Sequence, residues 1–253
     1  MIKFAGMSNN SKIAWTQATW NPVTGCEKTS DGCKNCYAEQ LVKRLKAMGQ
    51  AKYQNGFTPT LHPGSLNEPL KWKNPRLVFL PSMGDLFHKD IPFSFIDQVM
   101  DVILKCPQHT FQILTKRAER MNDYFSSRPI LENVWLGCTV ENQSTKWRMD
   151  CLRQLKAPVN FISHEPLLED LGMLDYTNID WVIAGGESGN KARKMEKSWV
   201  LNIKAQCDAS GTAFFFKQWG TWGEDGVKRS TKANRHLLDG AEYQAYPIPK
   251  KKP

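Results

Sequence analysis

The sequence predicts an α/β fold, a partial or distorted (βα) barrel of six to seven parallel strands. Six short apolar runs, rich in β-branched and aromatic residues, begin 21 to 34 residues apart. Unbroken apolar runs are typical of strands buried on both faces, and this spacing leaves room for a helix between successive strands. Strands that alternate with helices form a parallel sheet, either a barrel or an open sheet. The runs cover residues 76–80, 110–114, 133–137, 159–162, 180–184 and 212–216.

Three of the segments between these runs have the character of helices. In the first, 93–105, apolar residues such as Phe95 and Val99 recur at the spacing of one helix face. The second covers residues 143–155, and the third covers residues 197–210. We therefore expect helices that pack on the sheet between consecutive strands.

An earlier unit precedes the six runs. We expect a short first strand within residues 18–23 and a cysteine-rich loop at 25–37. An irregular insertion is expected at 50–74, because prolines and glycines interrupt any periodicity there. Between the loop and the insertion we expect a helix whose apolar stripe comprises Tyr37, Leu41, Leu45 and Met48.

The composition predicts one main domain in a soluble, cytoplasmic protein. The 253 residues include 34 Lys and Arg against 25 Asp and Glu, which gives a formal charge of +9. No apolar run reaches the roughly 18 residues that a membrane span needs, so we expect no membrane partner. We divide the chain into an N-terminal arm at 1–14, a barrel domain at 15–223 and a basic C-terminal extension at 224–253. The sequence leaves the oligomeric state open.

Much of the positive charge lies in the C-terminal extension. Residues 227–253 contain seven Lys or Arg against Asp239 and Glu242, which is +5 of the total of +9. A solvated basic tail is one interpretation of this excess. The other is a surface that binds the phosphates of a nucleic acid or a nucleotide.

Polar or small residues follow each apolar run. In a parallel barrel the carboxyl ends of the strands meet on one rim, where active sites form. Glycines after the run at 180–184 would also let backbone N–H groups approach a carboxylate, ribose or phosphate. We therefore predict a cofactor-binding site on this rim that is built from Ser82, Gly84, Asp85, Thr115, Lys116, Glu141, Asn142, Glu165, Gly185, Gly186 and Glu187.

The cysteine loop is the most informative motif. Cys26, Cys33 and Cys36 have the spacing C-x6-C-x2-C, and thiolates this close in a reducing compartment usually share a metal centre. Structural zinc binds four ligands, and the nearest histidine, His62, lies 26 residues beyond the last of these cysteines. An iron–sulfur cube held by three thiolates leaves one iron free for a substrate or cofactor. We therefore expect an iron–sulfur cluster, with zinc or free thiols as the alternatives.

Several segments of the chain resemble known families. A three-cysteine loop after the first strand of a (βα) barrel resembles the radical S-adenosylmethionine superfamily. Over about residues 15–223 the chain is more specifically similar to a phage and prophage family of three-cysteine-motif proteins of unsettled function. The segments that carry this likeness are WNPVTGC at 20–26, GCKNCYA at 32–38, LTKR at 114–117, VENQ at 140–143, EPL at 165–167, GGESG at 185–189 and FFKQWG at 215–220.

The superfamily resemblance implies a pair of cofactors. Cys26, Cys33 and Cys36 would hold a [4Fe-4S] cluster, and its fourth iron would bind S-adenosyl-L-methionine. One electron from an external reductant would then cleave this cofactor to methionine and a 5′-deoxyadenosyl radical, which abstracts hydrogen from a substrate. The chain departs from the superfamily pattern in two places. The first cysteine gap is six residues instead of three, and residues 82–85 replace the usual acidic glycine motif on the second strand.

The same resemblance implies roles for rim residues. Asp85 would accept a hydrogen bond from the amino group of S-adenosyl-L-methionine. Lys116 or Arg117 would pair with its carboxylate, and Glu141 or Asn142 would bind its ribose hydroxyls.

The leading hypothesis is therefore a radical S-adenosylmethionine enzyme that acts on a nucleic-acid base, a nucleotide or a related metabolite. We expect it in a bacterial or phage-infected host cell. One alternative is a nucleic-acid-binding protein with a structural iron–sulfur or zinc site. The other is a metal-dependent barrel hydrolase that uses Asp85, His88, His164, Glu165 and Glu187.

Overall fold

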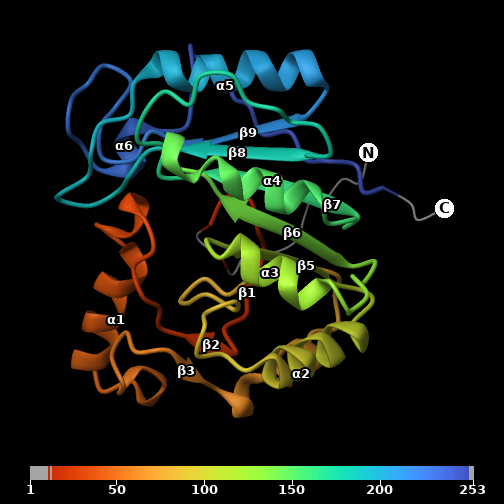
Figure 1. Ribbon diagram of the computed structural model, residues 1–253. Coiled ribbons are helices and arrows are strands. Elements are labelled where there is room, and N and C mark those ends of the chain that lie inside the picture. Colours follow the sequence, from red (N-terminus) through yellow and green to blue (C-terminus); the bar gives the residue numbers. More distant parts are fainter. Residues whose placement is uncertain (1–10, 12, 251–253) are drawn as a thin grey trace.

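A curled parallel sheet forms the centre of the molecule. The computed structural model describes residue 11 and residues 13–250, and seven of their strands form one sheet. Every neighbouring pair is parallel, and the sheet curls into a partial barrel (Figure 1). The predicted fold class is therefore confirmed. In spatial order the strands are β1 (Ala18–Thr19), β4 (Leu77–Leu80), β5 (Thr110–Thr115), β6 (Val134–Thr139), β7 (Val159–His164), β8 (Trp181–Gly185) and β9 (Ala213–Gln218).

Each of the six apolar runs forms a strand with both faces buried. In β4 the side chains of Leu77 and Phe79 belong to an aromatic-rich cluster inside the barrel. Those of Val78 and Leu80 belong to the larger cluster between the sheet and the helices. Because successive side chains of a strand point to opposite faces, a strand between two apolar layers needs an unbroken apolar run.

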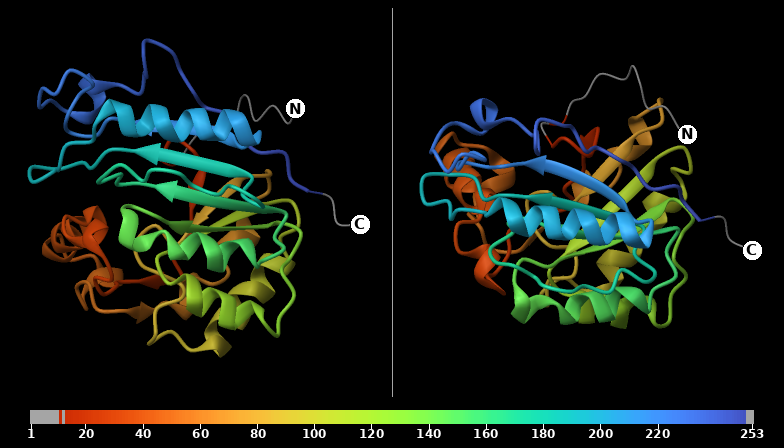
Figure 2. Two further views of the ribbon diagram at one scale, coloured as in Figure 1. Left: turned by 45° about the horizontal axis from the view of Figure 1, so that its top comes forward. Right: turned by 90° about the horizontal axis from the view of Figure 1, so that it is seen from above.

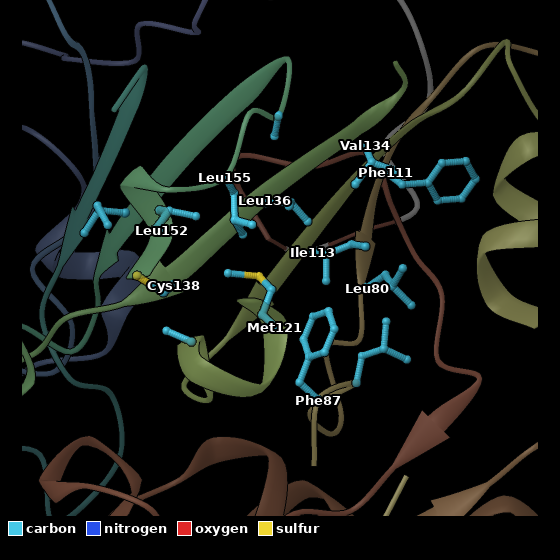
Figure 3. Close-up of a cluster of buried hydrophobic side chains, with 14 of the residues drawn as sticks. Leu80, Phe87, Phe111, Ile113, Met121, Val134, Leu136, Cys138, Leu152 and Leu155 are labelled. Carbon is cyan, nitrogen blue, oxygen red and sulfur yellow. The ribbon is translucent and has the colours of Figure 1, made fainter. Parts of the chain in front are cut away.

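Four helices cover the outer face of the sheet (Figures 1 and 2). Figure 3 shows Met121 on one of these helices, turned toward Ile113 and Leu136 of two adjacent strands. All three side chains are completely buried, so this helix is held by its apolar side. The four helices are α2 (Phe93–Leu104), α3 (Ala118–Phe125), α4 (Trp147–Arg153) and α5 (Lys197–Ser210).

The predicted helices are confirmed in part. Those at 93–105 and 197–210 form as α2 and α5. The one at 143–155 is divided into a 3₁₀ turn at Gln143–Thr145 and the short helix α4. Helix α3 was not predicted, because it is short and half of its residues are polar. Residues 165–180, all of which the structure describes, connect β7 to β8 without a helix.

The cysteine loop and the insertion are joined by a small second sheet. The predicted strand at 18–23 is divided, because only its first part belongs to the barrel as β1. The chain then forms β2 (Val23–Thr24), which pairs antiparallel with β3 (Thr60–Leu61) from the insertion. The rest of the insertion consists of 3₁₀ turns and loops, in agreement with its irregular sequence.

Helix α1 (Tyr37–Ala47) follows the cysteine loop, and its predicted apolar stripe is confirmed only in part. Ala38 and Val42 are its buried residues, and they form a cluster with Met83. Leu41 and Leu45 of the predicted stripe are partly buried against this cluster. The other two do not join it, because Tyr37 is 55% exposed and Met48, the residue after the helix, is 66% exposed.

The C-terminal extension lies against the last strand of the barrel. The N–H of Phe216 donates to the carbonyl of Tyr243, and the N–H of Ala245 donates to the carbonyl of Phe214. The extension also contains the short helix α6 (Thr231–Asn234) and the completely buried Leu238.

Residues 1–10 and 12 of the predicted N-terminal arm, and residues 251–253 of the extension, lie outside the described residues. Within the part that the structure describes, no helix is long and apolar enough to cross a membrane.

Candidate functional site

A cavity of about 470 Å³ opens at the carboxyl ends of the strands. In Figure 1 the strand arrows point toward the side of the molecule where α1 and the cysteine loop lie. The cavity is bordered by the cysteine loop on one side and, on the other, by residues at the carboxyl ends of β4, β5, β6, β7, β8 and β9 or directly after them. Trp15 and Phe79 from the inner cluster also border the cavity, so it has an apolar floor.

The three cysteines of the loop all border this cavity. Cys26 follows β2, Cys33 ends a 3₁₀ turn, and Cys36 directly precedes α1. Two glycines hold the loop in place. Gly25 has a φ of +82° and packs on the backbone of the insertion, and Gly32 lies against the carboxylate of Glu141. The loop is therefore docked on both sides, against the insertion and against Glu141.

The donor set of the loop suits a shared metal centre. Cys26, Cys33 and Cys36 come from one loop and border one cavity, with Cys33 buried and the other two half-buried. In an iron–sulfur cube each thiolate binds a different iron, so three thiolates are enough to hold it and one iron is left without a cysteine. A structural zinc site needs a fourth protein ligand, and no histidine among the described residues borders the cavity.

Burial and charge act differently on the thiols. Burial, together with the charge of Asp85, raises the pKa of Cys26 to about 11, although Arg117 opposes this shift. Burial alone would also raise the pKa of Cys33. There, Lys116 and hydrogen bonds with the backbone of Thr29 and Ser30 outweigh it, so the pKa lies below its usual value.

Asp85 is surrounded by hydrogen-bond donors. Its carboxylate accepts from the hydroxyl of Thr115 at 2.7 Å and from the guanidinium of Arg117 at 3.0 Å. It also accepts from the backbone N–H groups of Phe87 and Lys116, at 3.0 and 3.2 Å. Four donors occupy most of the lone pairs of one carboxylate. Asp85 therefore fixes the start of the segment after β5.

The side chain of Lys116 has fewer close hydrogen-bond and ion-pair partners than that of its neighbour Arg117. The nearest carboxylate to Lys116 Nζ is that of Glu141, at 4.0 Å. Glu141 is completely buried and pairs more closely with Arg148, at 2.9 Å. The ammonium group of Lys116 therefore borders the cavity with spare hydrogen-bonding capacity.

The opposite wall is built from two further ion pairs. Glu165 accepts from Lys217 Nζ at 2.8 Å with both carboxylate oxygens, and from Gln218 Nε2 at 3.1 Å. Glu187 pairs with Arg193 at 2.5 Å. Burial alone would raise the pKa of Glu187, but Arg193 and neighbouring donors hold it below its usual value.

The structure brings most of the predicted site residues to the cavity. Three of the predicted residues, Glu141, Asn142 and Gly185, do not border it. Glu141 pairs with Arg148, and the side-chain amide of Asn142 donates to Asp31 at 3.3 Å. Gly185 is the last residue of β8. Those that border the cavity with the three cysteines are Ser82, Gly84, Asp85, Thr115, Lys116, Glu165, Gly186 and Glu187.

The family of the chain follows from a comparison with family models. Residues 10–247 match a model described as Protein of unknown function (DUF5131). The chain belongs to the DUF5131 family. No curated protein and no solved structure matches this DUF5131 protein.

The histidines of this DUF5131 protein do not border the cavity. His164 is the last residue of β7, and its completely buried side chain lies between the carbonyl of Val140 and the hydroxyl of Tyr176. His88 is also buried, and one of its nitrogens lies 3.6 Å from the exposed carboxylate of Glu27.

The hydrolase residues suggested by the sequence are therefore not assembled around one metal. Among the described residues, Glu27, His88 and Asp90 are the one group with three such ligand atoms within 4.8 Å. Of the five hydrolase residues, only His88 belongs to this group. Lys89 already pairs with Glu27, at 3.0 Å.

Two contributors to the site were missed from the sequence. Lys217 follows the last apolar run, so the same rim argument that selected Lys116 would have found it. Arg193 lies in the loop after β8, and no local pattern distinguishes it from other surface arginines. It is recognised only from its contact with Glu187 in the folded protein.

Proposed function

We propose that this protein is a radical S-adenosylmethionine enzyme in which Cys26, Cys33 and Cys36 hold a [4Fe-4S] cluster. One observation carries the proposal. Three thiols from a single loop border one cavity at the carboxyl ends of a parallel barrel, where active sites of such folds form.

Lys116 is the residue that we assign to the carboxylate of S-adenosyl-L-methionine. The sequence left Lys116 and Arg117 as alternatives, and Arg117 is occupied by Asp85 and Cys26. Asp85 itself already accepts from four donors, so it has little capacity for the amino group of the cofactor. When bound, the two cofactors supply one-electron cleavage of a sulfonium to a carbon radical that abstracts hydrogen.

The remaining cavity residues bind the substrate and exclude water. Trp15 and Phe79 are 2% and 7% exposed, and their rings lie 4.6 Å apart at the cavity floor. Such an apolar floor suits a flat ring, and Lys217 and Gln218, which both donate to Glu165, border the same cavity. Together with the net charge of +9, this favours a nucleic-acid base or a nucleotide as substrate.

An external one-electron reductant completes the proposed reaction. All seven cysteines are free thiols in the structure, which suits the reducing cytoplasm where such a reductant is available.

The test is the metal content of protein purified without oxygen. Wild-type protein is expected to bind about four irons and four sulfides per chain, and S-adenosyl-L-methionine is expected to perturb the electron paramagnetic resonance spectrum of its reduced form. Cys33→Ala is expected to lose this iron. Cys151→Ala, which removes a half-buried thiol on α4, is the matched control and keeps it. Stoichiometric zinc without iron would contradict the proposal, and iron with an unperturbed spectrum would favour a structural cluster in a nucleic-acid-binding protein.

The substrate class is tested separately by product release. Reduced protein is incubated with S-adenosyl-L-methionine and with nucleosides, nucleotides, oligonucleotides or peptides. We expect 5′-deoxyadenosine to rise above background only with a nucleic-acid component. Equal release with every addition would contradict this substrate class and leave the cofactor proposal intact.

A further inference from the structure

Arg117 connects the cysteine loop to the barrel. It follows β5, and its side chain is only 13% exposed. One terminal nitrogen donates to the sulfur of Cys26 at 3.3 Å and to Asp85 at 3.0 Å. The other donates to the backbone carbonyl of Glu27 at 3.2 Å. A single guanidinium thus contacts a thiol, a carboxylate and the loop backbone.

Asp85, the carboxylate that pairs with this guanidinium, is itself held in place by other donors. It is 5% exposed, and it accepts from the hydroxyl of Thr115 and from the backbone N–H of Phe87. The fork of an arginine can serve several acceptors at fixed angles, which the point charge of a lysine cannot do. The donor to Cys26 is therefore pre-organised, and it does not depend on a flexible side chain that finds the sulfur by chance.

We propose that Arg117 is a positioning residue that raises the reduction potential of a cluster bound to Cys26. This inference rests on the proposed function. Reduction adds one negative charge to the cluster and its thiolates, and a partly buried cation that donates to one thiolate stabilises that charge. Hydrogen bonds to the sulfurs, net charge and exposure are the features by which proteins tune such potentials.

Arg117 is placed to act on the cluster more directly than two other cations near the loop, Lys116 and Arg193. Lys116 lies near Cys33 and Cys36, but the structure records no hydrogen bond from it to a cysteine sulfur. Arg193 pairs with Glu187 and donates to the carbonyl of Asp31 in the loop, at 3.0 Å. Arg193 therefore provides a matched control, because it carries the same charge and touches the same loop without touching a thiol.

The experiment compares Arg117→Gln, Arg117→Lys and Arg193→Gln with wild-type protein. Each is reconstituted with iron and sulfide without oxygen, and its iron content is measured. The midpoint potential is then measured by redox titration followed by electron paramagnetic resonance. For Arg117→Gln we expect about a tenfold smaller equilibrium constant for reduction, which for one electron is a midpoint potential about 59 mV lower. Arg117→Lys is expected to fall between wild type and Arg117→Gln, and Arg193→Gln to shift by much less.

The outcomes separate this inference from the proposed function. Wild-type protein that binds no iron overturns both. Wild-type protein that binds iron, with an unchanged potential in Arg117→Gln, overturns the role of Arg117 alone. An equal shift of the midpoint potential in Arg193→Gln also overturns it, because the shift would then come from the loss of any nearby positive charge and not from the hydrogen bond to Cys26. If Arg117→Gln loads too little iron for a titration, Arg117→Lys decides, and a potential equal to that of wild type rejects the inference.

Discussion

At the scale of single residues, the pleat of each strand decides which polar group reaches the cavity. Phe161 points into the barrel, and Ser163 and Glu165, two and four residues later, border the cavity. Ile162 points outward, and His164 follows it to the outer face. The sequence placed Glu165 in the cofactor site, but the hydrolase alternative set His164 and Glu165 side by side in one metal site. Side chains alternate between the two faces of a strand, so counting from Phe161 and Ile162 would have assigned Glu165 to the cavity side and His164 to the outer face.

The buried position of His164 makes stability dependent on pH. The carbonyl of Val140 can only accept, so the nearby Nδ1 carries the proton and Nε2 accepts from Tyr176. Burial lowers the pKa of His164 to about 4. Because the unfolded chain, with a pKa of about 6.5, then binds more protons, stability falls as pH drops from about 6.5 toward 4. This group is expected to remove about 2 kcal/mol of unfolding free energy between pH 7 and pH 5.

His164→Gln isolates this effect from that of other titrating groups. Glutamine keeps a donor and an acceptor but has no proton to gain in this range. Urea unfolding at pH 7 and pH 5 is expected to show a smaller loss in the variant than in wild type, by about 2 kcal/mol. Equal losses in the two proteins would contradict a neutral, buried His164.

At the scale of elements, the cysteine loop depends on a partner that lies far away in the sequence. Both the loop and the irregular insertion were recognised from local patterns. Their contact was not, because it depends on the close approach of Gly25 to the carbonyl of Thr58, 33 residues further along the chain. Local patterns were also incomplete for α1, because they found Leu41 and Leu45 but missed Ala38 and Val42, the residues that are buried with Met83.

Gly25→Ala tests this docking, with Gly49→Ala as its control. Both glycines have a positive φ, +82° and +72°, so alanine is strained at either position by roughly 1 kcal/mol. A Cβ on Gly49 meets nothing within 4 Å, whereas a Cβ on Gly25 collides with the backbone of Thr58. In chemical unfolding, Gly25→Ala is expected to lose about 2 kcal/mol more than Gly49→Ala. Similar losses would mean that the loop adjusts freely and is not held by the insertion.

At the scale of the whole molecule, the C-terminal extension completes an open barrel. The last strand, β9, would present an unpaired edge, and residues 243–245 pair with part of it. Beyond this contact, the ring of Tyr246 stacks on Trp181 at 5.3 Å and meets Phe215 at 5.6 Å. The basic composition of the extension indicated a phosphate-binding surface or a solvated tail. Its packing role depends on an edge that only the folded sheet creates, so composition alone could not reveal it.

Tyr246→Ala measures how much the extension contributes to the stability of the barrel. Removal of the ring loses two aromatic contacts with the inner cluster, so we expect about 1–3 kcal/mol less unfolding free energy in a denaturant titration. Ile248→Ala is the matched control two residues further on. Its side chain is 84% exposed, so the expected change is within about 0.5 kcal/mol. An equally small change in Tyr246→Ala would show that its ring does not stabilise the barrel, and that any contribution of the extension comes from its other contacts, such as the buried Leu238.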